Sequence, residues 1–292
     1  KDELADGTWA RETGVVSYRP FDPRWTVYNS NVAVHRRMRA TGHFLGVTAN
    51  LGLCVGKAGQ VVGSGEWNLV SCTRHPVDFN YFYRGGACNF PLFLTEDSQE
   101  LSLATRRRVN LSESFIDALR EMHSSARFQL DDTKAEFAFG YIYAILHSPS
   151  YRARYADFLK VDFPRIPVPA TELTYNALAT LGRALVASHL LENDPKTARP
   201  PKYTGASQPA VARTCWVEDA IWLDAGPTKK GRVQSRGSTG FIGVPEDVWN
   251  FHIGGYQVCE KWLKDRKGRT LSDEDIAHYQ KIIVAISETI RI

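Results

Sequence analysis

The chain has 292 residues, 43% of them hydrophobic and 23% charged, which is the composition of a globular protein with one large domain or two ordinary ones. This composition excludes disorder of the whole chain, and no apolar run reaches the roughly 18 residues that a membrane span requires. The net charge of +4 alone neither requires nor excludes an anionic partner.

The basic residues are unevenly distributed along the chain. Residues 36–108 contain nine basic and five acidic residues, and residues 199–236 contain seven and three, so each segment carries +4 and the remainder −4. This asymmetry favours a surface that contacts a polyanion. Arg and Lys side chains that decorate a solvated face would produce the same count, and the charges alone do not separate the two interpretations.

The start of the chain and its cysteines bear on cellular context. The sequence begins with Lys1 instead of Met and shows no signal peptide, so we expect a part of a longer cytoplasmic protein. The five cysteines form no CxxC pair, and His75 beside Cys72 has no second pair to complete a zinc site. We therefore predict buried free thiols and no metal.

Residues 1–109 are predicted to be a β-rich part. Apolar, β-branched stretches at 43–56, 66–72, 78–83 and 89–94 predict strands, because Gly and Pro residues punctuate the sequence between them. Pro91 is expected at the beginning of the last of these strands, where a missing N–H is tolerated.

Residues 110–193 are predicted to be helical. Asn110 and Glu113 fit the N-cap and N3 positions of a capping box, and a second helix is expected at about 135–147. The stripe Tyr151, Tyr155, Phe158 and Leu159 predicts a third helix. Residues 163–167 must be extended, because each residue before a proline of this FPRIP segment is disfavoured in the α region. A long helix then follows and ends near Glu192.

Residues 194–292 are predicted to be a basic loop region followed by a mixed α/β part. Residues 194–240 are rich in Pro, Gly, Lys and Arg, with a β-like insert at 215–223, and residues 245–251 predict a helix that opens on a Pro. Ser272 and Asp275 begin a closing amphipathic helix. The expected fold class is therefore α+β, with a β-rich N-terminal part, a helical middle and a mixed C-terminal part.

The sequence lacks the motifs of the common catalytic sites. It contains no GxxxxGK(S/T) P-loop, no GxGxxG, no GxSxG elbow, no HExxH, and no Pro-Pro-aromatic motif of amino-methylating DNA methyltransferases. The nearest approach to a nuclease metal set, residues 131–134, fits a helix N-terminus better. The chain is thus predicted to be a non-catalytic module, with no catalytic residues and no cofactor of its own.

Two kinds of DNA-contacting residue are predicted. Clusters of Arg and Lys neutralise phosphates, and Arg, Lys, Gln or Asn on loops between strands read base edges. The predicted phosphate contacts are Arg36, Arg37, Arg39, Arg106, Arg107, Arg108, Lys229, Lys230, Arg232 and Arg236. The predicted base-reading residues are Lys57, Gln60, Arg74, His75, Asn80 and Arg84.

Two further groups of residues leave alternatives open. Trp67 and Tyr83 are either core aromatics or part of the recognition loops. A basic group near Gly268 fits either phosphate contact or a surface salt-bridge network. Its members are Lys261, Lys264, Arg266, Lys267 and Arg269.

Four co-linear strings resemble a known family. They are residues 18–25 (YRPFDPRW), 50–53 with 89–94 (NLGL and NFPLFL), 141–167 (from YIYAILHSP to FPRIP), and 248–266 (from VWNFHIGGYQV to KWLKDR). Together they resemble the C-terminal specificity region of type ISP restriction–modification enzymes, over nearly the whole chain. Those enzymes join nuclease, translocase, adenine-N6 methyltransferase and target recognition domains in one chain.

The resemblance implies that the chain is a target recognition domain for a short asymmetric site in double-stranded DNA. It implies an upstream methyltransferase that uses S-adenosylmethionine and into which an adenine is flipped, together with motor domains in the same parent chain. It transfers no base-reading residue, because recognition loops differ between members. A rival interpretation is a protein–protein coupling module in which Tyr141, Tyr143, Tyr151 and Tyr155 are partly exposed anchors for those domains. A second rival is an enzyme whose residues escape motif analysis.

Overall fold

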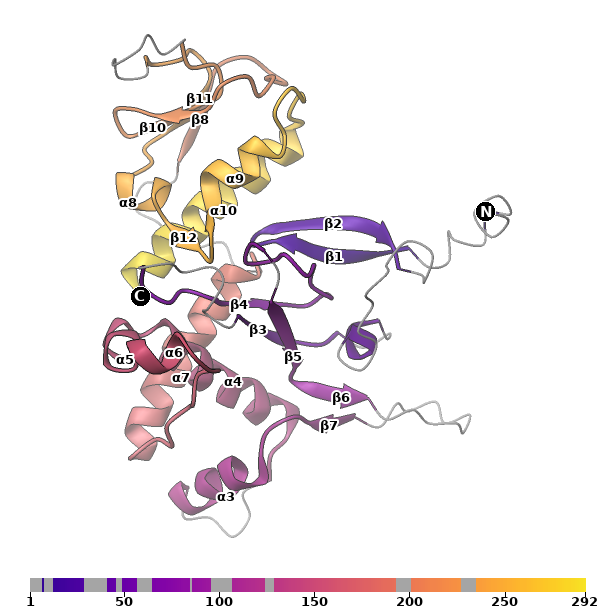
Figure 1. Ribbon diagram of the computed structural model, residues 1–292, viewed down its shortest axis with the longest axis vertical. Helices are drawn as coiled ribbons and strands as arrows, with labels where there is room; N and C mark the ends of the chain where they lie inside the picture. Colours follow the sequence, from indigo (N-terminus) through magenta and orange to yellow (C-terminus); the bar gives the residue numbers. More distant parts are fainter. Residues whose placement is uncertain are drawn as a thin grey trace. The chain divides into compact units, whose positions relative to one another are not determined.

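A computed structural model describes most of the chain as two compact units (Figure 1). The units are Lys1–Val186 and Ala187–Ile292, and each is described by itself. The described residues are 7, 13–28, 41–45, 49–56, 65–84, 86–95, 107–123, 129–192, 201–226 and 235–292. Strands precede helices in the first unit and mix with them in the second, so the α+β fold class is confirmed.

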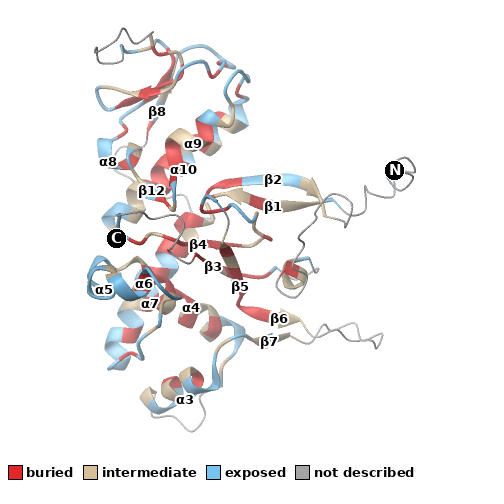
Figure 2. Cartoon of the chain, in the orientation of Figure 1, coloured by how far each residue is buried: buried red, intermediate tan, exposed pale blue. Residues whose placement is uncertain are grey.

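The first unit begins with short antiparallel strands. They are β1 (Thr13–Arg19), β2 (Asp22–Val27), β3 (Gly52–Gly56), β4 (Val70–Thr73), β5 (Ala87–Pro91), β6 (Phe93–Thr95) and β7 (Arg107–Val109). The first two form a hairpin, β6 pairs with β7, and β3 is the central strand of a sheet in the order β4-β3-β5. Buried residues are concentrated in this sheet, as Figure 2 shows.

Three strand predictions are wrong in detail. Residues Gly42–Phe44 form a 3₁₀ turn (η2), so the predicted strand 43–56 is wrong at its start, and β3 begins at Gly52. The predicted strand 89–94 is divided at Leu92, and Pro91 ends β5 instead of beginning a strand. Residues 78–83 form turns, because the Asp78 carboxylate accepts from the Asn80 N–H at 2.8 Å and competes with strand pairing.

The helices of the first unit follow the strands. They are α3 (Glu113–Met122), α4 (Asp132–His147), α5 (Pro149–Arg154), α6 (Ala156–Leu159) and α7 (Glu172–His189), of which the last continues beyond Val186. Asp131 caps α4, which confirms the interpretation of residues 131–134 as a helix N-terminus. The N-cap of α3 is Ser112, so the predicted capping box at Asn110 is wrong.

A hydrogen bond of Asn110 explains why it does not cap α3. The Asn110 amide donates to the Pro91 carbonyl at 2.8 Å, which leaves the Ser112 hydroxyl to accept from the Phe115 N–H. The third predicted helix is interrupted at Tyr155, so α5 and α6 are separate. Residues 163–167 belong to no helix, as the prolines predict.

Helices α4 and α7 approach closely at two glycines. A Cβ atom on Gly182 would lie 1.8 Å from the carbonyl oxygen of Gly140. Gly in a helix interior is otherwise less favourable than Ala by about 0.5–1 kcal/mol, so the close approach explains its presence.

The substitution Gly182→Ala is therefore expected to destabilise the first unit. Overpacking should cost about 1–3 kcal/mol, enough to lower the melting temperature by roughly 5 °C in a thermal melt. Gly14→Ala is the matched control, because a Cβ atom on Gly14 would have no neighbouring atom within 4 Å. Equal melting temperatures for the two variants would contradict the proposed helix contact.

The second unit packs a small sheet on two helices. Its strands are β8 (Lys202–Thr204), β9 (Cys215–Trp216), β10 (Ala220–Trp222), β11 (Gly240–Ile242), β12 (His252–Ile253) and β13 (Tyr256–Gln257), and the first four form a sheet in the order β8-β11-β10-β9. Its helices are α8 (Glu246–Trp249), α9 (Val258–Lys264) and α10 (Asp273–Arg291). The capping box of Ser272 and Asp275 that begins α10 is confirmed.

Aromatic side chains form the core of this unit. The Tyr279 ring lies 4.7 Å from the Phe241 ring and 5.0 Å from the Trp262 ring, and its hydroxyl donates to the Cys259 carbonyl at 3.0 Å. In Figure 2 the buried residues run along α9 and α10. These contacts fix α9 against α10 and so position the turn that follows α9.

The described residues also bear on thiols, metal binding and membrane insertion. Cys54, Cys72, Cys215 and Cys259 are buried free thiols, as predicted, and Cys88 is half-buried. Within the described residues, no group of three His, Cys, Asp or Glu side chains could hold a metal ion. None of the helices in the described part of the chain has the length and apolarity to cross a membrane.

Candidate nucleic-acid interface

The β1–β2 hairpin is fixed to the segment that follows β4. The Ser17 N–H donates to the Pro76 carbonyl at 2.8 Å, and the Ser17 carbonyl accepts from the Asp78 N–H at 3.0 Å. The Ser17 hydroxyl also lies 2.6 Å from the Thr73 hydroxyl. Hairpin and loop therefore present their side chains from one connected piece of the first unit.

Two guanidinium groups stack on one tyrosine of this hairpin. Those of Arg19 and Arg24 each lie 3.9 Å from the centre of the Tyr18 ring. Arg19 also pairs with Asp78 at 2.7 Å, and Arg24 pairs with the buried Asp22 at 2.7 Å. The ion pairs and the ring hold both guanidinium groups in place, with the Arg19 side chain 11% exposed and the Arg24 side chain 34% exposed. Arg24 is therefore the more accessible of the two to a phosphate or a base.

The loop that follows Asp78 is anchored by the buried Tyr81 and Phe82, and its exposed end is strained. Tyr83 and Arg84 adopt left-handed backbone angles with φ of 89° and 48°, and the Arg84 guanidinium lies 5.1 Å from the Tyr83 ring centre. A non-glycine residue in this region costs about 1–3 kcal/mol, and such strain concentrates at functional sites. Phe79 is 49% exposed and Tyr83 is 39% exposed, so apolar rings face solvent here.

These features define the hairpin–loop surface. Its residues are Tyr18, Arg19, Arg24 and Trp25 of the hairpin and Phe79, Asn80, Tyr83 and Arg84 of the loop. Cations and exposed aromatic rings in alternation are the side chains that contact nucleic-acid backbones and bases.

The predicted base-reading residues fall into two groups. Asn80 and Arg84 share the exposed loop, where the Tyr83 N–H donates to the Asn80 carbonyl at 2.9 Å. Arg74 and His75 lie at the opposite end of the sheet, because Thr73 pairs with the first residue of β3 and Ala87 with the last. Five extended residues separate these ends by about 13 Å. Lys57 and Gln60 lie outside the described residues.

The first of these groups has more exposure than the second. Asn80 and Arg84 are exposed, whereas Arg74 and His75 are half-buried and Arg74 approaches the Asn50 carbonyl at 3.5 Å. Burial, together with the Arg74 charge, lowers the pKa of His75, so its ring is neutral at pH 7. Of the four predicted base-reading residues that the structure describes, Asn80 and Arg84 alone lie on the hairpin–loop surface.

Most predicted phosphate contacts lie outside the described residues. These are Arg36, Arg37, Arg39, Arg106, Lys229, Lys230 and Arg232. The described ones are Arg107 and Arg108 on β7 and Arg236 in the second unit, where Arg236 is exposed and lies 5.1 Å from the Trp222 ring centre.

The residues around Arg236 hold the ends of the basic loop together. The Gly226 N–H donates to the Ser235 carbonyl at 3.3 Å, and the Asp224 carboxylate accepts from the Ser238 hydroxyl at 2.6 Å. Burial raises the pKa of Asp224, but the hydrogen bonds from Ser238 and Thr239 outweigh it and lower that pKa overall. An ionised Asp224 therefore ties the two described ends of this segment to the sheet.

Arg107 and Arg108 have different surroundings. The Arg107 guanidinium forms an ion pair with Asp132 at the start of α4 and lies 4.2 Å from the Phe93 ring centre. Arg108 is exposed, and neither an ion pair nor a hydrogen bond joins its side chain to the described residues. Neighbouring residues of a strand point to opposite faces, so of these two arginines Arg108 can contact a phosphate without first breaking an ion pair.

This difference predicts separable effects of two substitutions. Arg108→Ala should weaken binding to every duplex alike, by a few-fold, and leave the melting temperature unchanged, whereas Arg107→Ala should also lower the melting temperature. Anisotropy titrations and thermal melts of both variants check this expectation. A loss of stability in Arg108→Ala, or none in Arg107→Ala, would contradict it.

Several interface residues were not among the sequence predictions. They lie in the segment 18–25, for which the sequence predicted no DNA contact, and are Tyr18, Arg19, Arg24 and Trp25. The signal was there: Trp25 is 79% exposed, and a large apolar residue between charged and turn residues is typical of an exposed hairpin. Trp67 is 3% exposed and belongs to the core, while Tyr83 is at the surface.

The aromatic residues of the rival coupling module lie mostly in the interior. Tyr141, Tyr143 and Tyr151 are buried, and Tyr155 is 36% exposed. The Tyr141 hydroxyl donates to the Pro167 carbonyl at 2.9 Å, which explains its interior position. Only Tyr155 retains the exposure that the rival interpretation expects of all four.

The chain was compared with known families and structures. A family model described as Type ISP C-terminal specificity domain matches residues 1–292. No curated protein matches the chain.

Three solved structures share the fold. The first is a nuclease-deletion mutant of the Type ISP restriction-modification enzyme LlaGI in complex with a DNA substrate mimic, at 20% identity and a TM-score of 0.64. The second is the ATP-dependent Type ISP restriction-modification enzyme LlaBIII bound to DNA, at 17% identity and a TM-score of 0.66. The third is the cryoEM structure of a DrdV–DNA complex, at 19% identity and a TM-score of 0.69. Each alignment covers 96% of this chain but only 24%, 18% and 27% of the respective relative.

Proposed function

Because the chain belongs to the family of Type ISP C-terminal specificity domains, we propose that it recognises a short sequence in double-stranded DNA. It acts as the target recognition domain of a restriction–modification enzyme. The observation that carries this proposal is the match of the family model to the whole chain, residues 1–292. The three structural relatives, all solved with DNA or a DNA mimic, support the same ligand.

The hairpin–loop surface supports a division of labour within the first unit. Arg108 positions the duplex through its phosphates, and Asn80 and Arg84 reach base edges from the strained loop. Tyr83 and Trp25 supply rings that pack on sugars or bases. This arrangement agrees with a protein that binds DNA without altering it.

We further propose that the parent chain is a cytoplasmic adenine-N6 DNA methyltransferase with restriction activity. Its upstream domains would bind S-adenosylmethionine, and no residue of this chain is assigned to that cofactor. The chain spans 18–27% of the relatives, which leaves room in such a parent for methyltransferase and motor domains.

Methylome sequencing of cells that express the parent protein tests this assignment. One asymmetric motif with methylated adenine should appear, and substitutions in the hairpin–loop surface should change that motif or abolish the methylation. Methylation of many unrelated sites, or of none by a parent with an intact methyltransferase, would contradict the proposal.

The rival role as a coupling module retains one supporting feature. Phe158, Val161 and Leu173 are 75%, 81% and 81% exposed, and the first two line an apolar pocket of about 530 Å³ around residues 151–167. Exposed apolar patches mark contacts with other proteins or domains. Phe158→Ser should then leave DNA affinity unchanged and lower the activity of the parent protein, which separates the two roles.

A further inference from the structure

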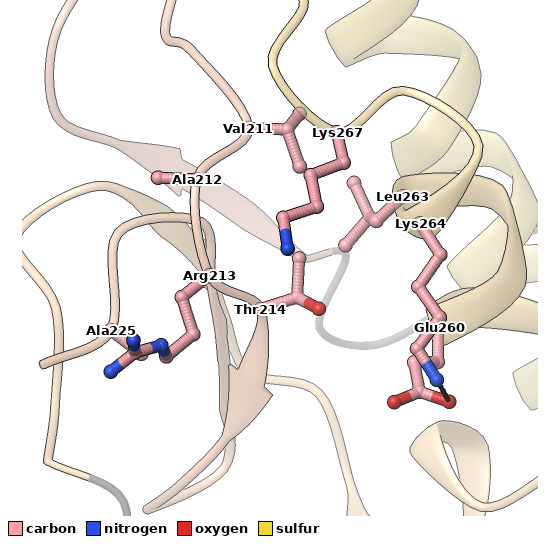
Figure 3. Close-up of a pocket in the computed structure, with 9 residues that line it drawn as sticks. All are labelled: Val211, Ala212, Arg213, Thr214, Ala225, Glu260, Leu263, Lys264 and Lys267. Atoms are coloured by element: carbon pink, nitrogen blue, oxygen red, sulfur yellow. Dashed lines mark ion pairs between the residues drawn. The ribbon is translucent and has the colours of Figure 1, made fainter. Parts of the chain in front are cut away.

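The second unit contains a positively charged pocket of about 690 Å³ (Figure 3). It lies between the segment that precedes β9 and the end of α9. Its lining residues are Val211, Ala212, Arg213, Thr214, Ala225, Glu260, Leu263, Lys264 and Lys267.

Cations outnumber anions in this lining. Arg213, Lys264 and Lys267 face a single carboxylate, that of Glu260, which pairs with Lys264 at 2.8 Å. Within the described part of the chain, no ion pair engages Arg213 or Lys267, and both side chains are exposed. The pocket thus retains two uncompensated positive charges. Figure 3 shows Lys267 reaching from the α9 side toward Thr214, with the Lys264–Glu260 pair below it.

Hydrogen bonds fix the two walls at a set distance. The Gly268 N–H donates to the Val211 carbonyl at 2.8 Å, and the Val211 N–H donates to the Arg269 carbonyl at 2.9 Å. Gly268 has a φ of 78°, which allows the turn to fold back on this segment. On the other wall, the Ala225 N–H donates to the Arg213 carbonyl at 2.9 Å. The backbone on both sides of the pocket is therefore fixed by hydrogen bonds.

Stabilisation of the helix C-terminus and ion pairing explain some of the positive charges at the end of α9, but not all of them. Cations near a helix C-terminus are stabilising, and Lys261 and Arg266 pair with Asp265 and Asp275. Neither effect accounts for Arg213, which belongs to another segment, or for Lys267, which follows the helix. The salt-bridge interpretation of this basic group therefore holds for its paired members alone.

We propose that this pocket binds a phosphate group of the DNA backbone, an inference that rests on the proposed function. A phosphate oxygen accepts hydrogen bonds from an ammonium and a hydroxyl, which Lys267 and Thr214 supply. The Arg213 guanidinium, which points away from these two groups in Figure 3, adds a further positive charge to the lining. The described lining contains no aromatic ring on which a nucleotide base could stack, which favours a backbone phosphate over a free nucleotide. Ala225 also leads directly into the segment that contains Lys229, Lys230 and Arg232.

The test is a salt titration with a fluorescein-labelled duplex of random sequence and the full-length protein. In the double variant Arg213→Ala and Lys267→Ala, the slope of log affinity against log salt should become shallower by about 2, and the low-salt affinity should fall about tenfold or more. The matched control removes Lys202 and Lys281, two exposed cations of the same unit outside the pocket. Thermal melts check that both variants fold.

The outcomes separate this inference from the function on which it rests. An unchanged slope in the pocket variant, or an equal change in the control, overturns the pocket assignment and leaves DNA recognition intact. Failure of the unaltered protein to bind any duplex overturns the proposed function and this inference with it. Binding of labelled ATP that the pocket variant loses, while its DNA slope is unchanged, assigns the pocket to a free nucleotide and also overturns the inference.

Discussion

The affinity for duplex DNA is expected to fall about a thousandfold when salt rises from about 50 mM to about 200 mM, because about six phosphate contacts release counterions. The ten predicted phosphate-contact residues supply enough cations for this number. They lie in the two segments with the largest positive excess, residues 36–108 and 199–236.

Fluorescence anisotropy of a labelled duplex over a series of salt concentrations measures this slope. Replacing chloride by glutamate at one concentration gives a control for anion competition at the protein surface. A slope near zero over the same range would mean that the basic segments face acidic parts of the protein, as the coupling-module interpretation requires.

Arg84→Ala is expected to relax sequence discrimination while preserving much of the non-specific affinity. A bidentate contact of an arginine with a guanine is worth about 1–3 kcal/mol of discrimination, so the preference at one base pair should fall about 5- to 150-fold. Arg84 is exposed on the strained loop, with its guanidinium 5.1 Å from the Tyr83 ring centre, so the side chain is accessible to a base edge. Competition between the recognised duplex and single-base variants measures the preference.

Arg84→Lys is the informative control. It keeps the charge but not the planar pair of donors, so discrimination should fall as in Arg84→Ala while the salt slope stays at the original value. If Arg84→Ala keeps the original discrimination and loses affinity for all duplexes alike, and Arg84→Lys regains that affinity, Arg84 contacts a phosphate and the base-reading role is wrong. Because Arg84 is exposed, neither substitution should lower the melting temperature.

The sequence predicted several elements that depend on local signals. The capping box of Ser272 and Asp275, the break in helical structure at 163–167 and the N-terminus of α4 follow from side chains a few residues apart, and all three are present. The capping box predicted at Asn110 failed, because the Asn110 amide donates to the Pro91 carbonyl and Ser112 caps α3. The predicted strand at 78–83 failed because the Asp78 carboxylate hydrogen-bonds to the backbone two residues later. That competition is decided by a single side chain and leaves the apolar pattern unchanged.

The site was less predictable than the fold because it depends on contacts between distant segments. Arg107 and Arg108 are adjacent and chemically identical, yet Asp132, 25 residues away, engages only the first. The hairpin–loop surface exists because Ser17 binds the backbone of Pro76 and Asp78. The pocket in the second unit arises in the same way, from a turn after α9 that pairs with Val211. No periodicity or motif in the sequence encodes such pairings.

Selection from a pool of duplexes with a randomised central region tests the claim of sequence-specific recognition most directly. The full-length protein, bound at moderate salt and sequenced after a few rounds, should enrich one asymmetric motif. The Arg84→Ala variant should enrich the same motif with one position degenerate. Strong binding without any enriched motif would contradict the account, since it would show a protein that holds the DNA backbone and reads no bases.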